Sequence, residues 1–481
     1  MPGIFSLPLI EPTMLATTME PRAKPTHAAQ RENDEIQRIR RRMNATGIGY
    51  AGLEGAWWLI AAQPFRLPAA ARIELANIGR AIFALFDAVA DAYAADDDAR
   101  SLLNAKIPAD IPRAISAQRV RSVRPDFQLR FDPAGAPYFI ATELEICPSA
   151  HGAAHAMQVG YGLHTDLADA FARFLGRREL WIAFASAWSE FLFDQLTFCR
   201  ALAERGIRAR LLLDTPFATL AERIARHELW RPPMFGVPVL PPDWRTDVAA
   251  RIEQHGFDAF IPNGEANWPD AAEAAVAFRF GYLDCFAADR RACMQRWEAC
   301  DAAFLNPTSF IFDSKVVMAA LGLLPVRQRI AAHHLAVLDR CIPETRLLTP
   351  DAIPQLQRER HAWVLKFAGY DGGQRAWGGR SLQVGALHTT ESWQGVLRCY
   401  LDLPFPVVAQ RAVPSARVDL DYADANGERR RMHGGNTRLR CFMLREGDDA
   451  VVCGAHLTAS DHQAQVSEGI GAIQAPVTFD G

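Results

Sequence analysis

The segment from residue 179 to residue 214 constrains the fold most, because it reads as strand, helix and strand in direct succession. ELWIAFAS and IRARLLLD are short apolar runs, and the amphipathic stretch SEFLFDQLTFCRALAERG between them ends at Gly206. Two strands joined through a helix pair in parallel, with the helix packed on the sheet. The sequence therefore predicts an α/β fold with a βαβ domain in mid-chain. No GxGxxG follows the first strand, which argues against the usual dinucleotide site.

The composition limits the classes of partner that this chain can bind. Its 481 residues suffice for roughly two or three domains, and 52 basic against 55 acidic residues give a net charge of −3. This charge argues against a nucleic-acid-binding or anionic-membrane surface, so we expect small-molecule partners. Nine cysteines show neither a CxxC pair nor zinc-site spacing, which favours reduced thiols in the cytoplasm. No apolar run approaches the roughly 20 residues that span a bilayer, and no pattern defines an oligomeric state.

The stretch RPDFQLRFDPAGAPYFIATELEICPSAHG, residues 124 to 152, predicts a β-hairpin. Two runs with alternating apolar residues flank the sequence DPAG, in which proline presets φ and glycine tolerates positive φ. The second run ends in Glu-Leu-Glu, where an ordinary hairpin would carry threonine or valine. The negative charge of this hairpin therefore needs an explanation.

Three carboxylates share one face of the hairpin if its strands pair directly around the turn. Glu143 then falls opposite or beside Asp126, and Arg124 lies near Glu145. Carboxylates gathered in this way repel each other unless a cation lies between them, and such hard oxygen ligands suit Mg²⁺ or Mn²⁺. The alternative is a solvated strand face on which Arg124 and Arg130 act as counter-charges.

A second group of residues suggests phosphate binding. In HAWVLKFAGYDGGQRAWGG, an apolar strand delivers Lys366 into a glycine-rich loop that contains Gly372 and Gly373. Glycines let backbone N–H groups approach phosphate oxygens, and a lysine adds positive charge. Upstream, FIFDSKVVMAAL places Lys315 at the start of an amphipathic helix. The loop is not a Walker loop, because GxxxxGK[ST] is absent, and a plain surface turn remains the alternative.

Two histidines stand four residues apart after the hairpin. The stretch from His151 to Gly176 is expected to form one helix, on which His151 and His155 share a face. Such a pair more often bonds backbone or phosphate groups than a metal ion, so we expect no metal site here.

The order of these motifs resembles that of the circularly permuted ATP-grasp proteins, including the glutathionylspermidine synthetase-like group. The resemblance covers about residues 120 to 470 and rests on the carboxylate hairpin, the βαβ domain, the NPTSFIFDSK helix start, the VLKxxGxxGG loop, the VVAQ strand and the final LRCFML…GAHLT hairpin. It implies an α+β ATP-grasp fold in which permutation moves the metal-binding carboxylates into the N-terminal half. We expect a flexible leader (1–30), where prolines interrupt any helix, followed by a helical region plus the carboxylate hairpin (31–178), and the resemblance adds a Rossmann-like pre-ATP-grasp domain (179–300) and an ATP-grasp nucleotide-binding region (301–481).

The resemblance also implies roles for individual residues. Arg124 of RPDF would face a phosphate or the charge of the transition state. The implied ligands of Mg²⁺ or Mn²⁺ are Asp126, Glu143 and Glu145. The implied ATP-binding residues are Lys315, Lys366, Gly372, Gly373 and Gln410.

The sequence departs from the family pattern at two positions. Glu145 stands where the family has asparagine, which adds a charge. Ala459 stands where an LTR motif would have arginine, so that Arg124, Arg438 or Arg440 must supply the catalytic charge, or none does.

The resemblance implies an ATP-dependent carboxylate–amine ligase that forms an amide through an acyl-phosphate intermediate. Its substrates would be a small carboxylate and a small amine. One alternative is a catalytically degenerate nucleotide-binding protein with a regulatory or scaffold role, which Ala459 favours. Another is a phosphotransferase or NTPase with a non-amine acceptor. Release of ADP that depends on an added amine separates the first hypothesis from the other two.

Overall fold

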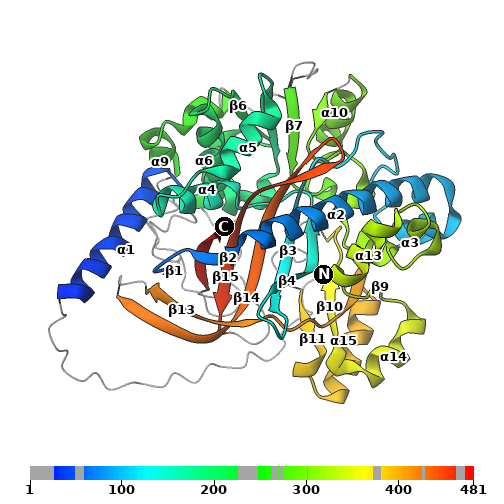
Figure 1. Cartoon of the computed structure of the whole chain (residues 1–481). Helices are drawn as coiled ribbons and strands as arrows, with labels where there is room; N and C mark the ends of the chain where they lie inside the picture. The colour runs from blue at the N-terminus through cyan, green and yellow to red at the C-terminus, as the bar shows by residue number, and fades with distance from the viewer. Residues whose placement is uncertain are drawn as a thin grey trace.

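The structure of the chain, a computed structural model, describes residues 27–48, 59–225, 248–262, 268–269, 275–300, 302–371, 381–424, 428–461 and 472–480. In these residues three β-sheets are surrounded by helices, giving the mixed α/β architecture that the sequence predicts (Figure 1). Most of the expected leader and the two glycines Gly372 and Gly373 lie outside the described residues.

The predicted βαβ unit forms a parallel sheet with the strand order β6-β5-β7-β8. Its helix, α6, follows β5 after a short 3-10 segment, as the apolar pattern indicates. The fourth strand extends the sheet just past residue 300. The elements of this part are β5 (Glu179–Phe184), η2 (Ser186–Phe191), α6 (Leu192–Ala203), β6 (Ala209–Leu213), α7 (Phe217–Ala225), α9 (Val248–Gln254), η3 (Phe257–Phe260), β7 (Ala275–Phe280), η5 (Leu283–Cys285), α10 (Ala288–Ala299) and β8 (Ala303–Phe304).

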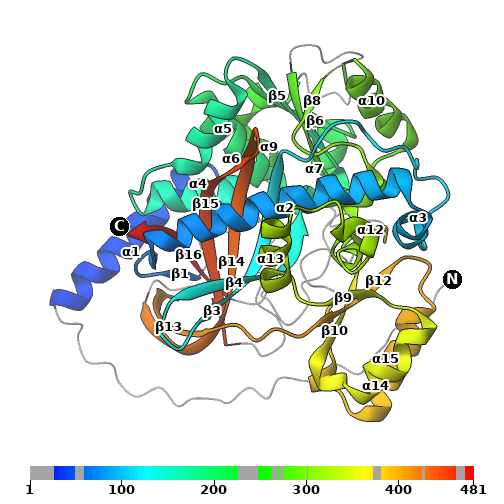
Figure 2. The same cartoon turned by 45° about the vertical axis from the view of Figure 1, so that its right-hand side comes forward.

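The largest sheet joins strands from both ends of the chain in the order β13-β1-β16-β15-β14-β3-β4, with β2 beside β16. Strand β3 pairs antiparallel with β14, although more than 300 positions separate Asp126 from its partner Arg440. The long helix α2 (Ala69–Ala95) crosses one face of this sheet (Figure 2). The strands are β1 (Leu59–Ala61), β2 (Phe65–Pro68), β3 (Ser122–Phe131), β4 (Pro137–Glu145), β13 (Arg417–Ala423), β14 (Arg429–Glu446), β15 (Asp449–Ser460) and β16 (Ile473–Asp480).

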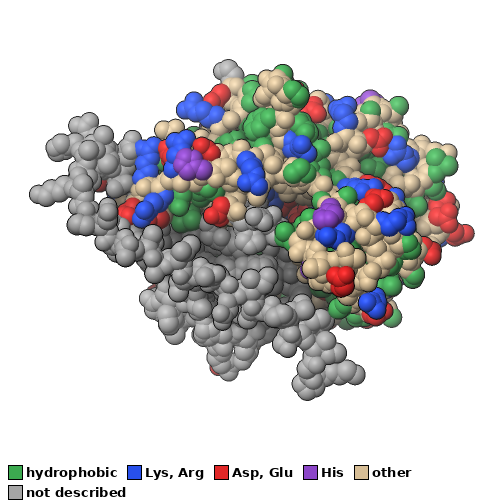
Figure 3. All heavy atoms as spheres, turned by 90° about the horizontal axis from the view of Figure 1, so that it is seen from below, with side chains coloured by type: hydrophobic (Ala, Val, Ile, Leu, Met, Phe, Trp, Pro, Cys, Tyr) green, Lys and Arg blue, Asp and Glu red, His purple; other side chains and the backbone are tan. Residues whose placement is uncertain are grey.

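The third sheet belongs to a small lobe with a hydrophobic core of its own. Its strands follow the antiparallel order β11-β10-β12-β9, and the core includes Trp363, Leu365, Trp393 and Leu397. In Figure 3, basic and acidic side chains are scattered over the coloured surface of this lobe among hydrophobic and other residues. The elements are β9 (Thr345–Leu347), η7 (Pro350–Ala352), α14 (Ile353–Arg358), η8 (Arg360–Ala362), β10 (Trp363–Phe367), β11 (Gln383–Val384), η10 (Gly385–Leu387), α15 (Thr390–Leu401) and β12 (Val407–Arg411).

The prediction of one helix from His151 to Gly176 is wrong, because the chain turns at Gly162. This glycine has a φ of +67°, and two helices, α4 (His151–Gly160) and α5 (Asp166–Leu175), flank the break. No helix among the described segments is both long and apolar enough to cross a lipid bilayer. The remaining helices are α1 (His27–Ala45), α3 (Asp97–Asn104), η6 (Phe310–Asp313), α11 (Val316–Ala320), α12 (Leu324–Arg327) and α13 (Ala332–Cys341).

The β3–β4 hairpin turns at the predicted sequence. The amide of Gly135 donates to the carbonyl of Asp132 at 2.9 Å, and Gly135 has a φ of +83°. The side-chain oxygen Oδ1 of Asp132 accepts from the amide of Ala136 at 2.8 Å. The carboxyl group of Asp132 therefore stabilises the turn and lies at the opposite end of the hairpin from Glu143.

We predict that Asp132→Asn changes the free energy of unfolding by less than about 0.5 kcal/mol, because the amide oxygen can accept the same bond. Asp132→Ala should cost about 1 kcal/mol, since the amide of Ala136 loses its partner. Chemical denaturation of both variants measures the difference. Equal stability of the two variants would show that the side-chain bond contributes nothing.

Candidate functional site

The predicted carboxylate face exists and is buried. Asp126 pairs with Glu143 and Arg124 with Glu145, and a register shift after Asp126 leaves Thr142 as the extra residue of a β-bulge. Asp126, Glu145 and Arg124 are only 1%, 3% and 4% exposed. The alternative of a solvated strand face is therefore wrong.

Three arginines surround the carboxylate of Asp126. Nε of Arg124 donates to Oδ1 at 3.0 Å, while Nη1 of Arg438 and Nε of Arg440 lie 3.4 Å and 3.7 Å from Oδ2. Arg438 and Arg440 are two residues apart on β14, so both point to the face that carries Asp126. Arg124 also donates from Nη1 to the carbonyl of Ser149 at 2.8 Å.

A histidine that the sequence analysis did not single out holds one of these arginines. Nη1 of Arg440 lies 3.2 Å from Nε2 of His456, its partner in the β14–β15 ladder. Burial, together with the charges of Arg440 and Arg124, lowers the pKa of His456 well below its ordinary value. The imidazole is therefore neutral, and Nε2 accepts from Arg440. The predicted LRCFML…GAHLT hairpin contains both residues, and a prediction of its register would have paired them.

Both predicted lysines reach strand β4 from different elements. Lys315 stands directly before α11, and its Nζ lies 2.6 Å from Oε1 of Glu143. Lys366 leaves β10 of the small lobe, and its Nζ donates to the bulge carbonyl of Thr142 and to Oε1 of Gln410, each at 2.9 Å. The structure thus brings Lys315, Lys366 and Gln410 together with the carboxylate hairpin.

The lysines and glutamates shift one another's proton affinities. Burial, with the charge of Lys315 added to it, lowers the pKa of Lys366 to about 8. Burial also opposes the charge of Lys315, but the negative charges of Glu143 and Glu145 outweigh it and raise the pKa of Lys315. Burial opposes ionisation of Glu143, yet Lys315 and Lys366 hold the pKa of this carboxyl well below its usual range. Burial and the charge of Glu143 raise the pKa of Glu145.

The carboxyl end of the parallel sheet also reaches the site. Tyr282 follows β7, and its hydroxyl lies 3.1 Å from Oε1 and 3.0 Å from Oε2 of Glu145. The ring of Trp188 packs edge-on against Tyr282 with centroids 5.1 Å apart. Ligands of open α/β sheets commonly bind outside the carboxyl ends of the strands, and the hairpin lies at this edge.

The carboxylates fit a divalent cation by chemistry more than by arrangement. Within the part of the chain that is described, no group of three or more His, Cys, Asp or Glu side chains has the arrangement of a metal site. Asp126 faces three arginines, whereas Glu143 and Glu145 share a hydrogen bond between their carboxyl groups. A hard cation can replace a proton shared by two carboxylates, so this pair can hold Mg²⁺ or Mn²⁺.

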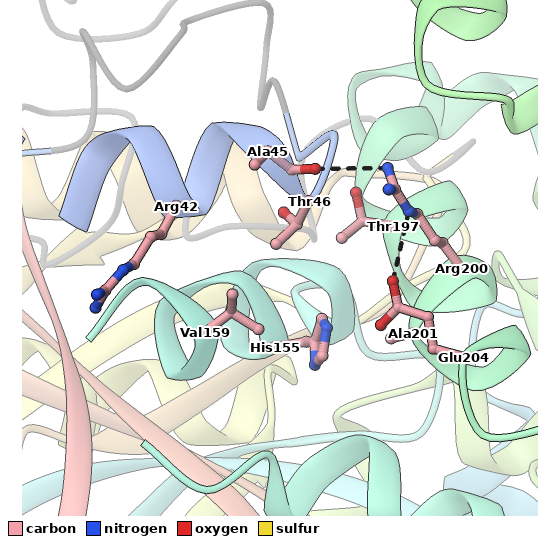
Figure 4. Close-up of a pocket in the computed structure, with 9 residues that line it drawn as sticks. All are labelled: Arg42, Ala45, Thr46, His155, Val159, Thr197, Arg200, Ala201 and Glu204. Atoms are coloured by element: carbon pink, nitrogen blue, oxygen red, sulfur yellow. Dashed lines mark hydrogen bonds and ion pairs between the residues drawn. The ribbon is translucent and has the colours of Figure 1, made fainter. Parts of the chain in front are cut away.

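The histidine pair lies elsewhere. Helices α1, α4 and α6 enclose a cavity of about 160 Å³ that His155 lines (Figure 4). There Nη1 of Arg200 donates to the carbonyl of Ala45 at 3.5 Å, and its Nε lies 3.6 Å from Oε1 of Glu204. Burial lowers the pKa of His155 to about 4. His151 packs among the rings of Phe171, Phe198, Phe278 and Phe442.

No family model matches this chain, and its sequence matches no curated protein. A solved structure with a similar fold is that of a glutathione synthetase-like effector from Globodera pallida in its apo form. The two chains are 10% identical, and the superposition covers 94% of this chain and 97% of that chain with a TM-score of 0.50. At this identity the likeness concerns the fold alone. The chain thus has a mixed α/β fold similar to that of a glutathione synthetase-like protein.

Proposed function

We propose that this chain is an ATP-dependent carboxylate–amine ligase with a circularly permuted ATP-grasp architecture. The observation that carries the proposal is the convergence of Lys315 and Lys366 on strand β4, beside the arginine cluster of β3 and β14. A buried lysine, Lys315, and a half-buried lysine of the small lobe, Lys366, suit the phosphates of a nucleotide. The fold of the glutathione synthetase-like effector is consistent with this function.

The five basic side chains of the site, Arg124, Lys315, Lys366, Arg438 and Arg440, outnumber the three carboxyl groups of Asp126, Glu143 and Glu145, so positive charge is in excess there. The charge of Lys315 contributes to the lowered pKa of Lys366, after burial, and the charges of Arg440 and Arg124 do the same for His456. A polyanion such as a triphosphate relieves this repulsion. A site for a neutral ligand would not need such an excess of positive charge.

The chain order supports the permutation. The carboxylate hairpin precedes both lysines in the sequence, yet it pairs with β14 near the C-terminus. We accordingly assign residues 31–178 to the permuted segment, 179–300 to a Rossmann-like pre-ATP-grasp domain and 301–481 to the nucleotide-binding region.

In the proposed reaction a carboxylate oxygen of the first substrate attacks the γ-phosphorus of ATP. ADP leaves and an acyl phosphate forms. The amine nitrogen of the second substrate then attacks the acyl carbon, loses a proton and displaces inorganic phosphate. Lys315 and Lys366 hold the phosphates, and the protein acts mainly by positioning reactants and by balancing charge. Glu143 and Glu145 would hold Mg²⁺, which when bound neutralises phosphate charge.

Ala459 faces away from the arginine cluster, because its ladder partner Thr437 lies on the opposite face of β14 from Arg438 and Arg440. Ala459 is buried on β15, and its ladder partner Thr437 precedes Arg438 on β14. Arg440, held by neutral His456, and Arg124 lie on either side of Asp126. The absence of arginine at position 459 also favours the second candidate, a nucleotide-binding protein of this fold that performs no ligation.

The decisive test measures Mg²⁺-dependent ADP release by the purified protein with panels of amino acids, polyamines and short peptides. A ligase should release ADP only when a suitable carboxylate and amine are both present. ADP release that ignores the amine would favour a phosphotransferase or NTPase. Tight ATP binding with no ADP release from any pair would favour the non-catalytic candidate.

We predict that nucleotide binding weakens about tenfold between pH 7 and pH 9, because Lys366, with a pKa of about 8, loses its proton in this range. Lys366→Arg should remove most of this dependence, since guanidinium stays charged. Lys366→Met should weaken binding already at pH 7. Dissociation constants measured by calorimetry at both pH values would contradict the assignment if they were equal in the wild type.

We predict that Arg124→Ala lowers ADP release by on the order of 10³-fold, because an arginine beside the transferred phosphoryl group stabilises its charge. Nucleotide binding should weaken but remain measurable. The matched control is Arg130→Ala on the same strand, whose guanidinium lies over the ring of Tyr138 outside the site. Equal rates for the two variants would remove Arg124 from the catalytic residues.

A further inference from the structure

We propose that Arg279 and Asp313 are positioning residues, whose buried ion pair sets the place of Lys315 relative to Lys366. The importance of this ion pair for catalysis rests on the proposed function, but the placement of Lys315 is testable without any nucleotide. Arg279 lies in β7 of the parallel sheet, and Asp313 ends η6 two residues before Lys315. The pair therefore connects one sheet to the segment that carries a site lysine.

The pair is bidentate and completely buried. Nη1 of Arg279 donates to Oδ2 of Asp313 at 2.9 Å and Nη2 donates to Oδ1 at 2.7 Å, and both side chains are 0% exposed. Further bonds hold each partner. Arg279 donates to the carbonyls of Gly281 at 2.7 Å and Pro307 at 3.2 Å, and Asp313 accepts from the amide of Leu283 at 2.6 Å.

Stability alone does not explain such a pair. Removing two charges from water costs about as much free energy as their attraction returns, and well-packed apolar residues often serve equally well. A planar guanidinium fork, by contrast, fixes both the distance and the direction of its carboxylate partner. The geometry of the pair is therefore better suited to placing a chain segment than to stabilising the fold.

The opposite side of the same segment is fixed by the end of β10. The amide of Lys315 donates to the carbonyl of Ala368 at 2.7 Å. A Cβ atom added to Gly369 would lie 2.4 Å from the carbonyl oxygen of Asp313, and Gly369 has a φ of +137°. Only glycine allows this close approach. Lys366 lies two residues before Ala368. The bond between the Lys315 amide and Ala368 therefore fixes the backbone of one lysine relative to that of the other.

The same network reaches the hairpin. Gly281, whose carbonyl accepts from Arg279, is followed by Tyr282, the hydroxyl donor to Glu145. Arg279 thus stands at the root of two connections, one to Lys315 and one to Glu145. A displacement of about 1 Å can cost on the order of 10²-fold in rate. These connections therefore matter most for reactants held between Lys315 and Glu145.

The first experiment follows hydrogen exchange of the Lys315 amide in nucleotide-free protein. Arg279→Lys keeps the charge but loses the fork, and we expect exchange at Lys315 to accelerate about tenfold or more while β5 stays protected. Gly369→Ala keeps the ion pair and should have the same effect through its clash with Asp313. If Arg279→Lys fails to fold, Asp313→Asn, which keeps the side-chain shape but loses one acceptor of the fork, decides in its place.

The matched control is Asp87→Asn. Asp87 forms another bidentate pair, with Arg445 of β14, at 2.9 Å and 2.7 Å, and this pair joins α2 to the large sheet. The variant should destabilise the protein without altering exchange at Lys315. Unchanged exchange at Lys315 in folded Arg279→Lys and Gly369→Ala, or equal acceleration in Asp87→Asn, would overturn the inference.

A second measurement connects the placement to the proposed function. The dissociation constant of Mg²⁺–ATP should rise about tenfold in Arg279→Lys and in Gly369→Ala and stay unchanged in Asp87→Asn. If the wild type binds no nucleotide, the proposed function is wrong, whereas the exchange result still decides whether Arg279 and Asp313 position Lys315. If exchange changes and nucleotide affinity does not, the pair holds the segment without serving the site.

Discussion

The antiparallel pairing of β3 with β14 is the interaction on which the candidate site depends. It sets Arg440 opposite Asp126 and thereby brings residues from the first third of the chain beside residues from its last tenth. Neither strand could bury its charges alone, because an unpaired carboxylate or guanidinium in the interior carries a large desolvation cost. Paired, the arginines of β14 compensate the acid of β3, and the sheet can close over a charged face. The remaining contacts of the site, including those of both lysines, involve residues of the hairpin that this pairing holds in place.

Glu145, which stands where the proposed family has asparagine, differs from asparagine less in this setting than its charge suggests. Burial, the adjacent Glu143 and the shared hydrogen bond favour the protonated form of Glu145. A protonated carboxyl group resembles a carboxamide, since it has one acceptor oxygen and one donor. The environment thus gives Glu145 a hydrogen-bonding character close to that of the asparagine of the proposed family. The cost is a dependence on solution pH that an amide would not have.

Local patterns predicted local structure well and distant pairing poorly. Turn chemistry and a period of two placed Glu143 opposite or beside Asp126, but they did not predict the bulge that makes the pairing direct. Apolar runs were enough for the βαβ unit. The break between α4 and α5 escaped because both helices present apolar residues at helical spacing on either side of it. The role of Tyr282 escaped because Glu145 lies 137 positions away in sequence, and no local periodicity encodes which strands meet. His456 lies only 16 positions from Arg440, but its role depends on the pairing and burial of both residues, which the pattern of apolar residues did not reveal. Lys366 was identified from the glycine-rich loop beside it and Lys315 from its place at the start of a helix, and the resemblance implied their shared role.

The bulge at Thr142 makes the orientation of the two glutamates depend on the number of residues in β4. A regular ladder continued from the pairing of Phe127 with Ala141 would set Thr142 opposite Asp126 and turn both glutamates to the other face of the sheet. One extra residue restores the parity that faces Glu143 and Glu145 toward the arginines, and its carbonyl becomes the acceptor for Lys366. Substitutions along this strand act one side chain at a time. Deletion of a single residue would turn the whole charged face to the other side of the sheet, so this strand tolerates substitutions far better than deletions or insertions.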